Sequence, residues 1–166
     1  MVTNESSASQ RRIVVGVDGS PSSRAALRWA IHQARLTGAA VDAVTAWRFP
    51  PGYEWAPGAT GTADFEAGAR RQLTAALNEA SGVEPEVAIR PSVVIGYPGP
   101  VLVEAARGAE LLVVGCRGHG GFTGALLGSV SSHCVHHAPC PVLVMRGEAA
   151  RSGKDRVSAA AASDRA

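Results

Sequence analysis

The sequence of 166 residues has little lysine and no long apolar run. Its single lysine is Lys154, close to the C-terminal end. The rest of the chain therefore has no lysine for a Walker A loop, a Schiff base or a kinase-type phosphate clamp. No run of about 18 apolar residues occurs either, and this excludes a typical membrane-spanning helix. We therefore expect any cation that meets a phosphate to be an arginine or a bound metal ion.

Cysteine is also scarce, with Cys116, Cys134 and Cys140 as the only three. An odd number without a CxxC spacing argues against both a disulfide framework and a structural zinc site, so we expect reduced thiols. His133 and His137 have the i, i+4 spacing of a helical metal pair, but no third ligand is arranged with them. We interpret them as solvated or capping histidines and predict no metal site built from a side-chain cluster.

Excess charge of either sign is missing as well. The formal net charge is +2, and the residues from Arg151 onward account for all of it, so the rest of the chain is balanced. A balanced body lacks the basic surface of a nucleic-acid-binding protein, and we expect no nucleic-acid partner. The first residues lack the apolar middle of a secretory signal, so we expect a soluble, cytoplasmic protein without a membrane partner.

Strand-like and helix-like segments alternate along the chain. The predicted strands are Arg12 to Val17, Ala40 to Ala46, Glu86 to Ile95, Leu111 to Val114 and Pro141 to Met145. The predicted helices are Pro21 to Gly38 with Ser20 as N-cap, Thr62 to Ser81, Gly99 to Arg107 and Gly128 to His137. Residues 11–146 form one predicted domain, between a disordered lead at 1–10 and a disordered tail at 147–166. Trp47 to Gly61 is predicted to be a long loop, either functional or mobile.

This alternation predicts an α/β fold with an open, parallel, five-stranded sheet and helices on both faces. Pro91 has no N–H for a ladder, which favours an edge position for the third strand. If the first strand neighbours the fourth, the loops that follow them meet at a topological switch point, where ligands bind in such sheets. Asp18 and the loop that begins at Gly115 would then face one pocket, although Asp18 is also typical of a simple turn before a helix.

Four positions near the end of the domain have a spacing that suits phosphate binding: Gly115, Gly118, Gly128 and Ser129. Glycines let backbone N–H groups approach a ligand closely, and Gly128-Ser129 opens a helix whose N-terminus favours anions. Arg117 lies between the first two glycines. Because Gly115 and Gly128 are expected at the rim of the sheet, we predict that larger residues there weaken ligand binding and leave the fold mostly intact.

The spacing glycine, two residues, glycine, nine residues, glycine, serine resembles the signature of the universal stress protein family, in its nucleotide-binding branch. VVGVDGSPSSRAAL, LLGSVS and APCPVLVMR are similar to that family as well, in the expected order, and the resemblance covers Arg11 to Arg146. It implies a Rossmann-like (HUP-type) sheet of order 3-2-1-4-5 with ATP at the carboxyl ends of the strands. It also implies a homodimer through the strand Pro141 to Met145.

The resemblance further implies the residues of a nucleotide site. On the adenine and ribose side they are Gly16, Val17, Asp18 and Val44. On the ribose and triphosphate side they are Gly115, Cys116, Arg117, Gly118, His119, Gly120, Gly121, Gly128, Ser129, Val130 and Ser131. Without lysine, such a site relies on backbone N–H groups, serine hydroxyls, Arg117 and Mg²⁺ held through the phosphates.

Three functions stay open at this point. The first is an ATP-binding stress or signalling module without catalytic residues, which we favour because no catalytic set is readable around the glycines. The second is a slow ATPase or adenylate-transferring enzyme in which Asp18 or His119 assists. The third is a binder of cyclic AMP or AMP, since backbone donors recognise a phosphate without counting how many there are.

Overall fold

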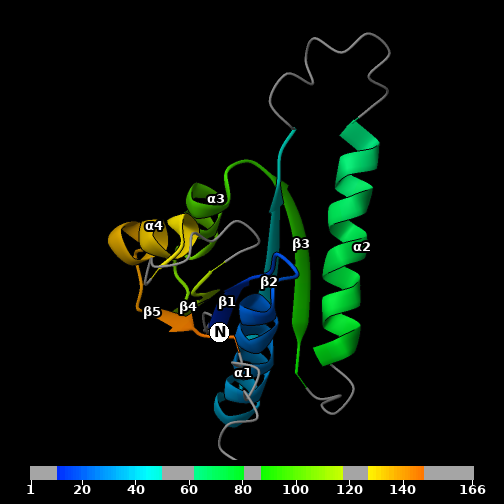
Figure 1. Ribbon diagram of the computed structural model, residues 1–166. Helices are drawn as coiled ribbons and strands as arrows, with labels where there is room; N and C mark the ends of the chain where they lie inside the picture. Colours follow the sequence, from blue (N-terminus) through cyan, green and yellow to red (C-terminus); the bar gives the residue numbers. More distant parts are fainter. Residues whose placement is uncertain (1–10, 50–61, 81–86, 118–126, 148–166) are drawn as a thin grey trace, which may run out of the picture.

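The computed structural model describes residues 11–49, 62–80, 87–117 and 127–147. Its strands and helices alternate along the chain (Figure 1). The strands are β1 (Arg12–Gly16), β2 (Ala40–Trp47), β3 (Ile89–Ile95), β4 (Leu111–Gly115) and β5 (Val142–Met145). The helices are α1 (Pro21–Thr37), α2 (Thr62–Ala80), α3 (Pro98–Ala105) and α4 (Ser129–His137). The expected order of elements is therefore confirmed.

The strands form one parallel sheet in the order β3-β2-β1-β4-β5. This confirms both the fold class and the strand order 3-2-1-4-5. β1 pairs with β2 on one side and with β4 on the other, so the chain reverses its direction of winding at β1. Pro91 lies in the edge strand β3, opposite Ala43, where its missing N–H is tolerated.

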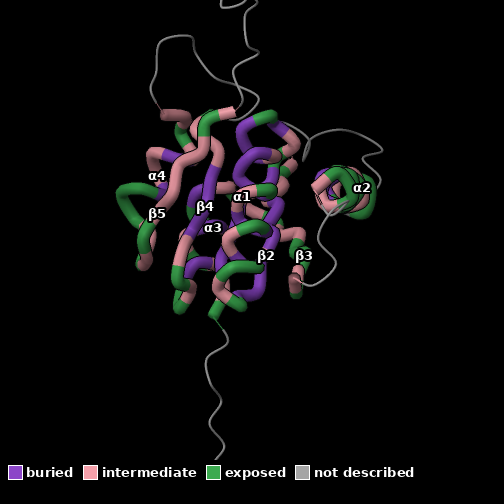
Figure 2. Tube along the Cα trace, turned by 90° about the horizontal axis from the view of Figure 1, so that it is seen from below, coloured by how far each residue is buried: buried purple, intermediate pink, exposed green. Residues whose placement is uncertain are grey.

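Helices cover both faces of the sheet, as Figure 1 shows. On one face, α1 and α2 pack on side chains such as Ile13, Val15 and Val41. On the other face, α3 and α4 pack on Val14 and Leu112, which have the opposite parity along their strands. In Figure 2 the buried residues run through the central strands and α1, while α2 has a broad exposed side. Burial of β1 and β4 on both faces explains their continuous apolar sequences.

The ends of α1 follow the expected capping pattern. The Ser20 side chain accepts a hydrogen bond from the Ser23 N–H, Pro21 occupies the first turn, and Gly38 ends the helix at a φ of 71°. Only glycine adopts such a left-handed conformation at little cost, which explains the stop. The N-terminus of α1 is therefore fixed directly after β1, where a ligand site is expected.

Several boundaries differ from the sequence-based expectation by one to three residues. Trp47 belongs to β2 and pairs with Ile95, instead of opening a loop, because two strands of similar length stay in register to their ends. β3 begins at Ile89, and α3 begins at Pro98, where proline suits the first turn. Residues 50–61, most of the predicted loop, lie outside the described residues, as do the predicted disordered lead 1–10 and all but the first residue of the predicted tail 147–166. Among the helices described, none is both long and apolar enough to cross a membrane.

Candidate functional site

A cavity of about 280 Å³ lies at the carboxyl ends of β1, β2 and β4. α3 and α4 close one side of it, and the first residues of α1 close another. Its lining is largely apolar near the strands and polar near the helix N-termini. The described residues that line it are Gly16, Val17, Asp18, Ser20, Ser23, Val44, Ala46, Pro98, Leu102, Val114, Gly115, Arg117, Gly128, Ser129, Val130 and Ser131. The loops after β1 and β4 therefore share one pocket.

Most of the expected site residues come together here. Ten of them line the cavity: Gly16, Val17, Asp18, Val44, Gly115, Arg117, Gly128, Ser129, Val130 and Ser131. Cys116 lies beside it without being part of the lining. Gly118, His119, Gly120 and Gly121 lie outside the described residues.

Sequence reasoning missed six lining residues, namely Ser20, Ser23, Ala46, Pro98, Leu102 and Val114. Val114 precedes Gly115 directly, and the period-2 pattern of β4 already places it on the face of α3 and α4. Pro98 and Leu102 belong to the short helix α3, whose sequence carries apolar residues but no ligand motif. Their part in the site follows from the fold alone.

The N-terminus of α4 faces the cavity without a side-chain cap. Its N-cap is Gly128, whose own N–H donates to the Cys116 carbonyl at 2.7 Å. The first intrahelical bond runs from the Ser132 N–H to the Gly128 carbonyl at 2.9 Å. The N–H groups of Ser129, Val130 and Ser131 therefore have no partner within the helix. Such groups, together with the helix dipole, favour an anion.

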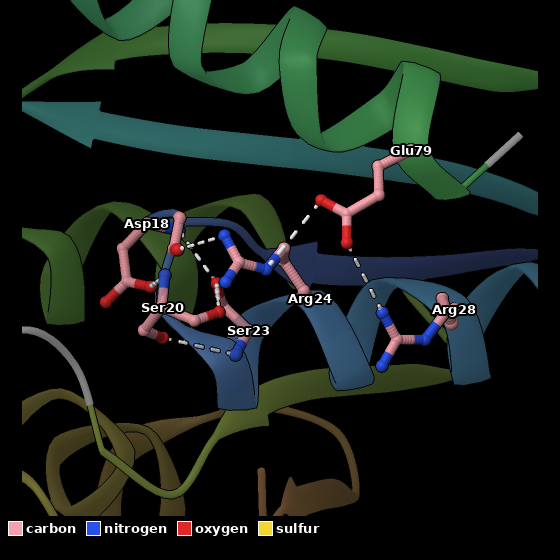
Figure 3. Close-up of polar contacts among 7 residues, drawn as sticks. Asp18, Ser20, Ser23, Arg24, Arg28 and Glu79 are labelled. Atoms are coloured by element: carbon pink, nitrogen blue, oxygen red, sulfur yellow. Dashed lines mark hydrogen bonds and ion pairs between the residues drawn. The ribbon is translucent and has the colours of Figure 1, made fainter. Parts of the chain in front are cut away.

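The N-terminus of α1 is arranged differently, because a serine side chain caps it (Figure 3). Ser20 Oγ accepts from the Ser23 N–H at 3.2 Å, and Asp18 Oδ1 accepts from the Ser20 N–H at 2.9 Å. The bond from the Ser20 N–H makes the Asp18 carboxylate part of a turn before α1, which is one of the two roles that the sequence suggests for Asp18. The same carboxylate is exposed and lines the cavity, so the turn brings it to the ligand side as well.

Salt bridges hold α1 against α2 next to this turn. Glu79 of α2 lies between Arg24 and Arg28 of α1, at 3.8 Å and 3.9 Å, as Figure 3 shows. Arg24 also donates to the Gly19 carbonyl at 2.9 Å. These exposed pairs contribute little energy individually, but they connect α2 to the turn that carries Asp18.

Gly115 has a packing role that the sequence does not indicate. A Cβ at this position would lie 2.9 Å from both the carbonyl carbon of Ser22 and the nitrogen of Ser23, which are backbone atoms of α1. The expectation that a larger residue leaves the fold mostly intact is therefore wrong for Gly115. At Gly128 the nearest atom to an added Cβ is the Cys116 carbonyl oxygen at 3.4 Å, an ordinary contact. Of these two glycines, only Gly128 has room for an added Cβ.

The three thiols differ in their surroundings. Cys134 of α4 is fully buried in the core cluster that contains Leu102 and Leu112, and burial raises the pKa of its thiol from 9.0 to about 11. Burial also raises the pKa of Cys140. None of the three cysteines forms a disulfide bond. Within the described ranges, no three histidine, cysteine or acidic side chains meet in a group that could hold a metal ion.

The universal stress protein family model matches residues 10–146 of this chain. A curated universal stress protein of Mycobacterium tuberculosis is 37% identical over 139 residues, which cover 81% of this chain and 43% of that protein. The chain thus spans less than half the length of such curated relatives.

Two solved structures have the same fold. The universal stress protein UspA from Lactobacillus plantarum aligns with a TM-score of 0.69 at 24% identity, over 82% of this chain and 97% of that one. A universal stress protein in complex with cAMP aligns with a TM-score of 0.53 at 31% identity, over 81% of this chain and 95% of that one.

Proposed function

This chain belongs to the universal stress protein family, and from this premise we propose that it binds an adenine nucleotide, ATP first of all, and acts as a nucleotide-dependent stress or signalling module. The observation that carries the proposal is the meeting of an apolar cavity with the uncapped N-terminus of α4. The cavity accounts for a base and a sugar, and the helix N-terminus accounts for phosphate.

The base has apolar walls on the strand side of the cavity. Val44 and Val114 come from β2 and β4, Val17 directly follows β1, and Leu102 of α3 lines the same cavity. Three of these four side chains are exposed by no more than 3%, and Val44 by 4%, so a flat ring that enters replaces water against a rigid surface. We assign adenine to this end and the ribose to the region between Asp18 and Gly16.

The phosphates extend from there toward α4. The N–H groups of its first turn supply donors, and Arg117, two residues after β4, supplies a cation in the lining of the same cavity. Because the sequence has no lysine apart from Lys154, Mg²⁺ held through the phosphates is the natural partner for the remaining charge. Gly118, His119, Gly120 and Gly121 complete the set that we assign to the phosphates.

Cyclic AMP is a specific alternative ligand. It is favoured by the relative that was solved in complex with cAMP, which is 31% identical to this chain. A cyclic monophosphate presents one negative charge and needs fewer donors than a triphosphate, so the α4 N-terminus alone could satisfy it. Mg²⁺ should raise the affinity for ATP and leave the affinity for cyclic AMP unchanged. Titrations with and without Mg²⁺ therefore separate the two ligands.

We also propose a cytoplasmic homodimer. β5 is an edge strand of four residues, all half-buried and apolar, with one side unpaired in the sheet. Pairing this edge with a second copy would cover it. Light scattering on the purified protein measures the mass directly, and Val144→Lys is expected to convert a dimer into a monomer. A wild-type protein of monomer mass would contradict this part of the proposal.

Nucleotide binding is tested by calorimetric titration of the purified protein with ATP and Mg²⁺, cyclic AMP and AMP. Mass spectrometry of small molecules released on denaturation identifies any nucleotide that co-purifies. Gly128→Val is the diagnostic variant, because its backbone (φ −75°, ψ 169°) suits valine and its side chain would cover the α4 N-terminus. We expect it to remain folded and to lose at least tenfold in affinity.

Thr37→Val is the matched control. Thr37 lies at the far end of α1, where its hydroxyl donates to the Gln33 carbonyl at 3.0 Å, and it is remote from the cavity. The Thr37→Val variant should bind each nucleotide with the affinity of the wild type. No measurable binding of any of the three nucleotides at millimolar concentration would refute the proposed function. Equal affinity of Gly128→Val and wild type would refute the placement of the phosphates.

A further inference from the structure

Two consecutive carbonyl groups after β4 are held by serine hydroxyls from two different helices. The Arg117 carbonyl accepts from Ser22 Oγ and from Ser20 Oγ, the second at 3.3 Å, at the N-terminus of α1. The Cys116 carbonyl accepts from Ser131 Oγ of α4 at 3.1 Å, in addition to the Gly128 N–H. We call this arrangement of Ser20, Ser22 and Ser131 the serine clamp.

The serine clamp is buried. Ser20, Ser22 and Ser131 are exposed by 3%, 5% and 1%, respectively. A buried hydroxyl that lost its acceptor would keep its desolvation cost, so these bonds are maintained in the folded state. Ser20 and Ser22 lie more than 100 residues before Ser131 in the chain, and the backbone that follows β4 passes between the two groups. The bonds therefore fix this backbone from both sides.

The clamp has an electrostatic consequence for an anion at the cavity. A carbonyl oxygen carries partial negative charge, and one that turned toward a phosphate would repel it. The Arg117 oxygen is instead drawn to the N-terminus of α1, where partial positive charge and two hydroxyls receive it. The Cys116 oxygen likewise holds the Gly128 N–H and, through it, the start of α4. The donors of α4 are thereby kept in place at the cavity.

We propose that Ser22 is a positioning residue for phosphate: it never touches the nucleotide, but it holds the Arg117 carbonyl away from the phosphates and so sets their affinity. The inference rests on the nucleotide site proposed above. Ser20 and Ser131 line the cavity, whereas Ser22 is absent from the described residues that do so. Ser22 can thus be changed without changing the surface that a ligand meets, and it isolates the effect of the clamp.

The experiment compares ATP with adenosine, which lacks phosphate, in calorimetric titrations of wild type and Ser22→Ala. Loss of one hydrogen bond of ordinary net strength corresponds to roughly a three- to tenfold change. We expect Ser22→Ala to raise the Kd for ATP by that factor and to leave the Kd for adenosine unchanged. A serine that only supports the fold would weaken both ligands in the same proportion, and that result would overturn the proposal.

Two further measurements complete the test. Amide hydrogen exchange should be faster at the Gly128 N–H in Ser22→Ala, because its acceptor lies one residue from the released carbonyl. Thr37→Val, which also removes a hydroxyl bonded to a carbonyl, should change neither affinity nor exchange. If Ser22→Ala fails to fold, Ser22→Cys retains a weak donor of similar size and should give an intermediate Kd for ATP.

Failure of this inference and failure of the proposed function give different results. A wild-type protein that binds no ATP would overturn the function and the positioning role together. Normal ATP affinity in Ser22→Ala, with a wild type that binds ATP well, would overturn only the positioning role.

Discussion

Gly115→Ala is expected to destabilise the fold itself. The added Cβ would lie 2.9 Å from two backbone atoms of α1, whereas carbon atoms in contact are normally about 3.5–4.0 Å apart. Relief requires a movement of ~0.6 Å between β4 and α1. α1 cannot move freely, because Ala26, Leu27 and Ala30 of its buried face are exposed by 0%. Overpacking of this kind costs about 1–3 kcal/mol.

Urea denaturation followed by tryptophan fluorescence measures this cost. With a slope of about 2 kcal/mol per molar urea, the midpoint of Gly115→Ala should fall by roughly 0.5–1.5 M. Gly128→Ala is the matched control, since its Cβ meets nothing closer than 3.4 Å. At that position a stiffer unfolded chain and a weaker N-cap have opposite effects of similar size, so the midpoint should barely change. Equal midpoints for Gly115→Ala and wild type would refute the close approach of β4 to α1.

Two other predictions concern positions away from the cavity. Because the pKa of the Cys134 thiol is raised from 9.0 to about 11, the unfolded chain loses this proton first, and stability should decline as pH rises from 9 toward 11. Urea midpoints across that range should fall more steeply for wild type than for Cys134→Ala, and parallel slopes would contradict the assignment. Arg12 donates to Asp42 at 2.8 Å and to the carbonyls of Ala105 and Arg107, so Arg12→Leu should cost about 1–3 kcal/mol. Its nucleotide affinity should stay at the wild-type value, as titration would check, because Arg12 lies at the opposite end of β1.

The sheet could be predicted because its central strands are buried on both faces. Val14 and Val15 point to opposite helical layers and are both fully buried, which forces the continuous apolar run that marks β1. The boundaries of β2 and β3 were harder to predict from the sequence, since the ends of these two strands depend on their mutual register. Trp47 pairs with Ile95 although the residues after it, with proline and glycine, are typical of a loop.

The site was predictable to the extent that it depends on strand ends. Asp18 and Gly115 follow the two strands that meet at the switch point, and that rule brings them to one cavity. The sequence could not show why position 115 is a glycine, because a glycine allows close approach of a ligand or of another backbone equally well. Ser22, which lies opposite it, is distant in the sequence, and only the folded chain brings the two together.

The two helix N-termini at the cavity have similar sequences and different roles. From the N-cap onward, α1 reads Ser20-Pro21-Ser22-Ser23 and α4 reads Gly128-Ser129-Val130-Ser131, and by local chemistry both helix ends suit an anion. In the fold, the Arg117 carbonyl accepts from the Ser20 and Ser22 hydroxyls at α1, and the Ser20 side chain caps the Ser23 N–H. At α4 the Cys116 carbonyl accepts from the Gly128 N–H and from the Ser131 hydroxyl, but the N-cap is a glycine and no side chain caps the N–H groups of the first turn. The serine cap of α1 and the uncapped first turn of α4 therefore favour α4 for the phosphates of the proposed nucleotide, so the choice between the two helices is made by the fold around them.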